Sequence, residues 1–277
     1  MGDAAGIGPE VILKALDNNE ARAAANYLVY GSPEVMERAA TFVNWKGHVR
    51  GVANPAECLF RDNEIEVITC RTIGMEDCKT GEISAACGDL AFQSIRRAIE
   101  DAQAGLIDAT ATAPINKDAL SRAGHKFAGH TEIYAYFTNT ADYTMLLMEG
   151  NLRVVHVSTH VPLRHAIDLV KKDRIVKVIK LVREALIGMG IANPRIAVAG
   201  LNPHAGENGM FGREEIDDIG PAVAEATGLG AVGPIPPDTV FSRAAGGEYD
   251  AVVAMYHDQG HIPVKMAGFR YGGPDGP

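Results

Sequence analysis

The sequence predicts an α/β protein, and three features of the chain support this expectation. Helical stretches alternate with short β-branched runs along the 277 residues. Polar segments rich in histidine follow several of the β-branched runs. With 47% hydrophobic residues, the chain can form one large α/β domain or two modest lobes. The composition marks no linker, repeat or boundary between lobes.

The first expected helix begins at Pro9 and continues to Leu16, after a turn that contains Gly6 and Gly8. Proline suits the first helical position because its missing N–H would have no partner there. In an α/β protein a strand should lead into such a turn, yet Met1 already lies inside it. We therefore expect the unit to be incomplete at this end.

The remaining expected elements follow from apolar periodicity. Helices are expected at 88–101 and 173–189, and short strands at 108–112, 153–158, 195–199 and 251–255. The buried helix faces should carry Leu90, Ile95, Ala98 and Ile99 in the first helix, and Ile175, Val178, Ile179, Val182 and Leu186 in the second. The segments 113–117, 159–163, 201–207 and 256–261 then follow the carboxyl ends of the four strands, where open α/β sheets bind ligands.

Three histidines in these strand-end segments are candidate metal ligands: His160, His204 and His257. Neutral imidazole binds divalent first-row metals, and three such ligands leave coordination positions open for substrate. Any one of them alone is more simply a hydrogen-bonded loop histidine. Their shared placement favours a metal site.

Other histidines have different expected roles. His156 lies among valines and lacks the following glutamate of a zincin motif, so we expect it to pack within a strand. His165 should face solvent or a charged partner, whereas His48 and His125 have no distinguishing context. His261 follows a candidate ligand by four residues, and a supporting role beside the ligands stays open.

Two further segments and one lysine can each be interpreted either as part of a binding site or as an ordinary structural feature. The turn at 2–10 fails both the G-x-G-x-x-G fingerprint and the P-loop pattern, so it is either a special site or a tight turn. His130 and Thr131 suit an anion at a helix start, although Thr131 could simply cap that helix. Lys265 could supply charge or a proton to a substrate, or could be solvated.

Charge and composition exclude several classes of partner. The net charge of -9 and pI near 5.5 disfavour nucleic acid. No apolar run reaches the roughly 20 residues of a membrane span and the first residues lack a signal peptide, so we expect a cytoplasmic protein without membrane contact. The four cysteines form no C-x-x-C pair and should be ordinary thiols.

Seven ordered segments together resemble one protein family. They are GDAAGIGPE at 2–10, TAPINK at 112–117, AGHTE at 128–132, THVPL at 159–163, LNPHAGE at 201–207, GPIPPDTVF at 233–241 and YHDQGHIPVK at 256–265. The chain is similar in these segments to 4-hydroxythreonine-4-phosphate dehydrogenases of pyridoxal phosphate (pyridoxine) biosynthesis and their paralogues. The first segment also resembles the GDGIGPE turn of isocitrate and isopropylmalate dehydrogenases. The resemblance implies a two-lobed α/β/α sandwich that is not a standard Rossmann fold.

The resemblance also implies roles for individual residues. The family's metal ligands fall on His160, His204 and His257, the same histidines that strand-end placement selects. His130, Thr131 and Lys265 become substrate-binding residues. Among catalytic candidates, Lys265 is joined by the acids Asp238 and Asp258.

The activity implied by this family is NAD-dependent, metal-assisted oxidation of a 4-phosphorylated hydroxy acid, followed by loss of carbon dioxide from the β-keto acid. The divalent metal would be zinc, magnesium or cobalt. The family also implies a homodimer whose metal site draws on both subunits. Residues 1–277 would then form one incomplete catalytic unit of two lobes with discontinuous boundaries.

Two departures from the family pattern matter. Family chains continue well beyond Gly268-Phe269, with substrate-contacting Asn and Arg and further cofactor-binding sequence, so we expect truncation here too. The HDQGHIP form at 257–263 looks more like paralogues that act on threonate or erythronate 4-phosphate in sugar-acid catabolism. A metal-dependent hydrolase and an inactive fragment are the alternatives of other classes.

Overall fold

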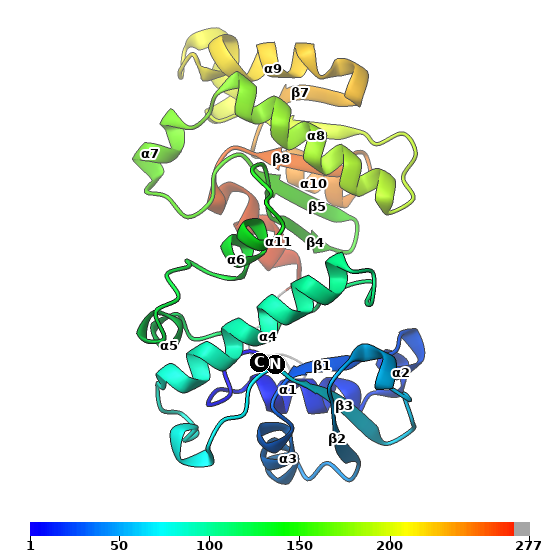
Figure 1. The fold of residues 1–277 in the computed structure, drawn as a ribbon. Coiled ribbons are helices and arrows are strands. Elements are labelled where there is room, and N and C mark those ends of the chain that lie inside the picture. Colours follow the sequence, from blue (N-terminus) through cyan, green and yellow to red (C-terminus); the bar gives the residue numbers. More distant parts are fainter. Residues whose placement is uncertain (269–277) are drawn as a thin grey trace. The chain divides into compact units, whose positions relative to one another are not determined.

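A computed structural model describes residues 1–268. The truncation expected after Gly268-Phe269 therefore lies outside the described residues. The chain divides into two compact units, Met1–Ala141 and Asp142–Pro277, shown in blue to green and in green to red in Figure 1. Each unit is one continuous stretch of the chain. No helix within residues 1–268 is both long and apolar enough to cross a membrane.

The first unit is built on a three-stranded parallel sheet with strand order β1-β3-β2. Its strands are β1 (Leu28–Gly31), β2 (His48–Val52) and β3 (Glu64–Thr69). Its helices are α1 (Gly8–Leu16), α2 (Asn19–Ala24), α3 (Pro33–Phe42), α4 (Ala85–Gln103), α5 (Lys117–Arg122) and α6 (His130–Phe137). Short 3-10 turns lie at Pro55–Glu57 and Met75–Asp77.

Alternating strand residues divide the core of this unit between two faces. Val29 and Val67 pack with residues of α1 and α3, whereas Tyr30 and Ile68 pack with Ala98 of α4 on the other face. This alternation follows from the two-residue period of a strand. The unit is therefore a small α/β layer structure.

The helices expected in the first unit are confirmed, but the prediction of a strand at 108–112 is wrong. Pro9 stands in the first turn of α1, and α4 buries all four residues expected on its inner face. Residues 108–112 form no strand. A short strand needs a neighbouring ladder, and the described part of the chain pairs none with this partly exposed segment.

The second unit contains a five-stranded sheet with order β4-β5-β8-β6-β7, in which only β4 is antiparallel. Its strands are β4 (Leu146–Glu149), β5 (Leu152–His156), β6 (Ile196–Ala199), β7 (Ala231–Ile235) and β8 (Ala251–Ala254). Its helices are α7 (Leu163–Asp168), α8 (Lys172–Gly188), α9 (Gly220–Glu225), α10 (Val240–Ala245) and α11 (His257–Gly268). Shorter helical turns are η3 (Pro203–Gly209), η4 (Glu215–Ile219) and η5 (Thr227–Leu229).

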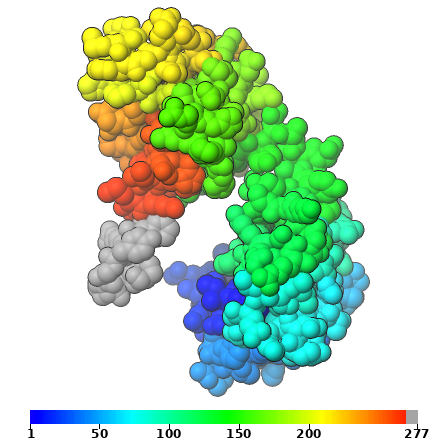
Figure 2. All heavy atoms as spheres, turned by 90° about the vertical axis from the view of Figure 1, so that its left-hand side faces the viewer, coloured from blue at the N-terminus to red at the C-terminus, as the bar shows by residue number. Residues whose placement is uncertain are grey.

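Helices cover both faces of this sheet and give three α/β/α layers. Val155 and Val253 pack with α8 on one face, and Val154 and Val252 pack with α10 on the other. Figure 2 shows α11, in red, packed beside the orange segment that carries α10. Strands buried on both faces read as continuous apolar runs, which explains why 153–158, 195–199 and 251–255 were recognisable.

The order of the strands positions the candidate site. The expected strands at 153–158, 195–199 and 251–255 are confirmed as β5, β6 and β8, and the expected helix at 173–189 is confirmed as α8. Because β5, β8 and β6 are parallel neighbours, their carboxyl ends lie along one edge. The segment 256–261, expected as a loop, is instead the start of α11.

Candidate metal and substrate site

Two of the three candidate metal ligands lie close together at this edge. His160 follows β5, and His257 begins α11 just after β8; β5 and β8 pair with His156 opposite Ala254. The ring centres of His160 and His257 are 5.5 Å apart. Two imidazoles bound to one tetrahedral ion have ring centres about 5 Å apart, because each metal–nitrogen bond is about 2 Å long. The pair therefore fits two ligands of a single divalent ion.

An acidic neighbour leaves one nitrogen of His257 available. Its Nδ1 lies 2.7 Å from Oδ1 of Asp258. A carboxylate that accepts a hydrogen bond from one ring nitrogen fixes the tautomer, so the other nitrogen keeps its lone pair for a metal. Asp258 itself is exposed, and its carboxylate contacts the imidazole of His257.

The third candidate ligand, His204, lies in an unusual turn beyond β6. Its side chain is 64% exposed, with Nδ1 3.4 Å from Oε2 of Glu207 and its ring edge-on to Phe211. Within residues 1–268, no three or more His, Cys, Asp or Glu side chains are gathered so as to hold a metal ion. The structure therefore brings His160 and His257 together, while the role of His204 stays a prediction.

The turn that carries His204 is left-handed over five consecutive residues. The φ angles of residues 204–208 lie between 44° and 83°, and only Gly206 among these five residues is a glycine. A left-handed conformation costs a non-glycine residue about 1–2 kcal/mol. His204, Ala205 and Glu207 therefore store on the order of 3–6 kcal/mol, which surrounding contacts must offset, whereas asparagine at 208 adopts this conformation more readily.

Two more histidines, His156 and His261, lie beside His257. The His261 ring stacks on His257 with centres 3.6 Å apart, and its Nδ1 lies 3.0 Å from the carbonyl oxygen of His257. The His156 ring lies 4.7 Å from that of His261. The spacing of four residues between 257 and 261 was the available signal, because it places two side chains on one face of a helix.

His156 is fully buried on β5, as the sequence predicted. Neither ring nitrogen has a hydrogen-bond partner of normal geometry among the described residues. Burial, together with the neighbouring His261, lowers the pKa of His156 from 6.5 to about 4. The ring is therefore neutral at pH 7. His165 is exposed beside Asp168, which confirms its expected position.

The other predicted site residues are distributed over both units. Lys265, on α11, and Asp238, just before α10, are exposed. His130 and Thr131 begin α6 in the first unit, where Gly129 rather than Thr131 occupies the cap position. His130 is half-buried, its Nε2 has no partner among residues 1–268, and burial lowers its pKa. An unpaired buried nitrogen at a helix start suits a polar ligand group.

The glycine-rich turn at 2–10 packs against another of the recognised segments. Gly2 has a φ of 76°, and a Cβ there would collide with the carbonyl oxygen of Pro114. Asp3 donates its backbone N–H to the same oxygen at 2.9 Å. Gly2 is therefore required by a close backbone approach, which supports the tight-turn interpretation.

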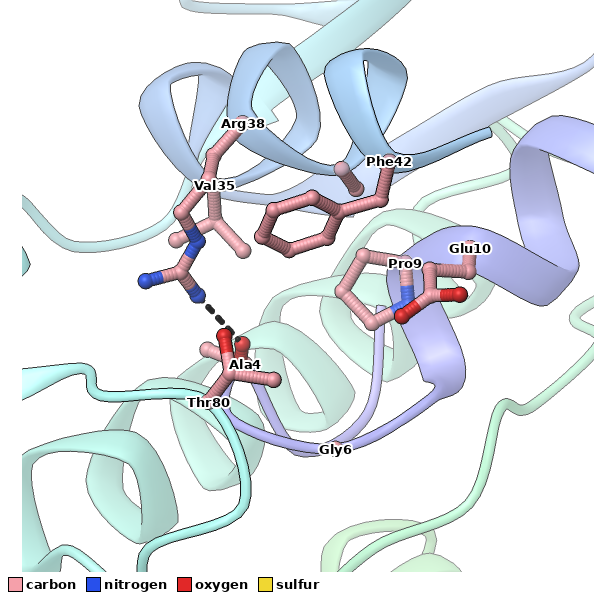
Figure 3. Close-up of a pocket in the computed structure, with 9 residues that line it drawn as sticks. Ala4, Gly6, Pro9, Glu10, Val35, Arg38, Phe42 and Thr80 are labelled. Carbon is pink, nitrogen blue, oxygen red and sulfur yellow. Dashed lines mark hydrogen bonds between the residues drawn. The ribbon is translucent and has the colours of Figure 1, made fainter. Parts of the chain in front are cut away.

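A small pocket lies beside this turn (Figure 3). Gly6, Pro9, Phe42 and Thr80 line it, and Arg38 reaches across to donate a hydrogen bond to the carbonyl oxygen of Ala4 at 3.0 Å. Its empty space, including solvent at the mouth, is about 210 Å³. The enclosed cavity itself is only about 10 Å³, room for about one water molecule, so this pocket does not hold a phosphorylated sugar acid.

Histidines thus gather at the carboxyl edge of a mostly parallel sheet, where open α/β sheets bind ligands. Comparison with known proteins identifies the class. The family described as "Pyridoxal phosphate biosynthetic protein PdxA" matches residues 23–272. D-threonate 4-phosphate dehydrogenases of Pectobacterium atrosepticum and Salmonella typhimurium are each 46% identical to this chain, over 98% of it and 84% of their own length.

A solved structure agrees with this assignment. The chain superposes on 4-hydroxythreonine-4-phosphate dehydrogenase from Klebsiella pneumoniae with a TM-score of 0.89 and 46% identity, over 97% of this chain and 82% of that one. The chain therefore belongs to the PdxA family, whose named members are dehydrogenases, oxidoreductases that act on a hydroxyl group. The resemblance stated from the seven sequence segments is confirmed.

Proposed function

We propose that this protein is an NAD-dependent, metal-assisted dehydrogenase of a four-carbon, 4-phosphorylated hydroxy acid, with D-threonate 4-phosphate as the first candidate substrate. The observation that carries the proposal is the separation of 5.5 Å between the rings of His160 and His257 in a member of this family. The names of the relatives and the HDQGHIP segment favour threonate over 4-hydroxythreonine. Erythronate 4-phosphate is the stereochemical alternative.

The residues of this chain have distinct proposed tasks. His160 and His257 would hold a divalent ion, with His204 as the third ligand; imidazole ligands favour zinc or cobalt over magnesium. Bound metal would polarise the substrate hydroxyl oxygen, and NAD would accept the hydride. The oxidised carbon becomes the ketone of a β-keto acid, which loses carbon dioxide and leaves a three-carbon phosphorylated ketone.

Charge for the substrate comes from other side chains. Lys265 would contact the substrate and return a proton to the carbon that loses carbon dioxide. His130 and Thr131 would bind the anionic end of the substrate at the start of α6. Asp258 would orient His257 through the 2.7 Å contact, and Asp238 would serve as a nearby acid.

We also propose a homodimer whose metal site draws on both subunits. His204 is not gathered with His160 and His257 in the single chain, and a second copy could supply the missing ligand. Sedimentation at equilibrium with and without zinc would test this assembly. A monomer that binds metal with unchanged affinity at all protein concentrations would contradict it.

The catalytic proposal is tested by following NADH absorbance with purified protein. D-threonate, D-erythronate and 4-hydroxythreonine 4-phosphates are supplied separately, each with zinc, cobalt or magnesium. We expect NADH formation with one of these acids and release of carbon dioxide in equal amount. Phosphate release without NADH would instead indicate a metal-dependent hydrolase, and no reaction with any substrate would refute the proposed activity.

A further inference from the structure

A buried carboxylate lies beneath the turn that carries His204. Glu215 is 5% exposed and begins η4. Its Oε1 accepts hydrogen bonds from the backbone N–H groups of Leu201 and Asn202, each at 2.7 Å. Its Oε2 accepts a third from the side-chain amide of Asn202 at 2.9 Å. One side chain thus ties together the first residues after β6.

The turn is shaped to receive this carboxylate. A Cβ on Gly206 would lie only 2.6 Å from Oε2 of Glu215, and a Cβ on Gly200 would lie 3.2 Å from Oε1. Glycine at both positions therefore lets the backbone close around the carboxylate. His204 lies between these two contacts, within the left-handed stretch, and its backbone direction depends on both ends of the turn.

The other side of the contact is rigid. Glu215 precedes Ile219 and Ala222, which are fully buried in the core against α8. Glu215 is therefore fixed to the body of the second unit, whereas the side chain of His204 is exposed and lies beside Glu207 and Phe211 of the same turn region. The order of the turn comes from the carboxylate rather than from the histidine.

We propose that Glu215 is a positioning residue that holds His204 in the direction required of a metal ligand. The inference rests on the proposed function, because it takes His204 as the third ligand. Glu215 acts through the backbone of residues 200–206 and does not itself touch the metal or the substrate. Buried charge-assisted hydrogen bonds of this kind are strong and directional, which suits them to this task.

Three variants separate the reach of this side chain from its charge. Glu215→Asp keeps the charge but withdraws the carboxylate by one methylene. Glu215→Gln keeps the reach and the oxygen that accepts both backbone N–H groups. Asp217→Asn is the matched control, because Asp217 lies in η4 with Glu215 but is exposed, and among residues 1–268 its side chain pairs with Arg213 alone.

The measurement is metal affinity of the folded protein, by titration with cobalt and its visible spectrum, and by zinc competition with a chromophoric chelator. We expect Glu215→Asp to weaken metal binding by about 10- to 100-fold and to change the cobalt spectrum. The loss of metal affinity in Glu215→Gln should be several-fold smaller than that in Glu215→Asp, and the metal affinity of Asp217→Asn should equal that of the wild type. Turnover at saturating metal should recover in all three.

Melting temperatures distinguish this role from general support of the fold. A structural role alone would lower the melting temperature of Glu215→Asp and leave its metal affinity unchanged, and that result would overturn the inference. Weakening by Glu215→Gln but not by Glu215→Asp would also overturn it, because charge rather than hydrogen-bonding reach would then act. His204→Ala serves as the reference, because unchanged metal affinity in that variant would refute His204 as a ligand and with it this inference. The proposed activity is refuted separately, by absence of NADH formation with any of the three substrates.

Discussion

Replacement of His156 by leucine should remove much of the acid sensitivity of the second unit. The imidazole is fully buried on β5, and burial lowers its pKa to about 4, whereas the unfolded chain has the ordinary value of 6.5. Between these values the unfolded state binds more protons than the folded state. Stability is therefore lost as the pH falls from 6.5 towards 4.

The magnitude follows from the two pKa values. The full shift corresponds to about 3 kcal/mol, since one pKa unit is 1.36 kcal/mol. At pH 5 the folded ring is still mostly neutral while the unfolded one is mostly charged, so about 2 kcal/mol is already lost relative to pH 7.5. Leucine cannot take up a proton, and the variant should be spared this loss.

Urea unfolding followed by circular dichroism, in metal-free buffer at pH 7.5 and pH 5, measures the effect. His261 and the carboxylates titrate in both proteins, so only the difference between their two pH dependences is interpreted. A difference of about 2 kcal/mol corresponds to about 1 M urea in the midpoint. Equal losses in wild type and His156→Leu would refute the assignment of a neutral, buried His156. Metal stoichiometry should be the same in both.

Three further changes have defined outcomes. His257→Ala should lower metal affinity and turnover together, measured by metal titration and NADH formation; full turnover in this variant would exclude it as a ligand. Gly260→Ala should lower the free energy of unfolding by about 1–3 kcal/mol, because the new Cβ would collide with the buried imidazole of His156. Gly188→Ala is the control: a Cβ there meets nothing within 4 Å, so the free energy of unfolding in the same urea assay should be unchanged or slightly higher. Tyr30→Phe should lower the free energy of unfolding by about 1–3 kcal/mol, because it removes the 2.8 Å hydrogen bond that Tyr30 donates to buried Asp101. An unchanged melting curve would show that this hydrogen bond does not contribute to stability.

The elements with strong local patterns were predictable from sequence. α8 has a helical stripe of six buried residues, five of which the periodicity predicted. The strands β5, β6 and β8 are largely apolar because helices cover both of their faces. The strand expected at 108–112 was wrong because a short segment becomes a strand only by pairing with a neighbouring strand, and the described residues offer this one no partner. Pairing of that kind has no local signal.

For the candidate site, the sequence identified residues but not their arrangement. Strand-end placement selected His160 and His257, and the order β5-β8 in the sheet then brought their rings together. The sequence did not show that 256–261 begins a helix, so the stacking of His261 on His257 was left open. Glu215 was not selected, because an acid between other acids looks like a solvated surface residue.

The sequence by itself determined the family, the α/β class and the set of histidines available for a metal, because these depend on residue identity and on patterns over a few turns or strands. The tertiary structure decided which histidines meet, that His156 is kept neutral, and that a carboxylate at Glu215 lies under a left-handed turn at 204–208. Those properties depend on burial and on contacts between segments distant in the chain. Local periodicity carries no information about them, because the free energies involved arise only when the segments pack.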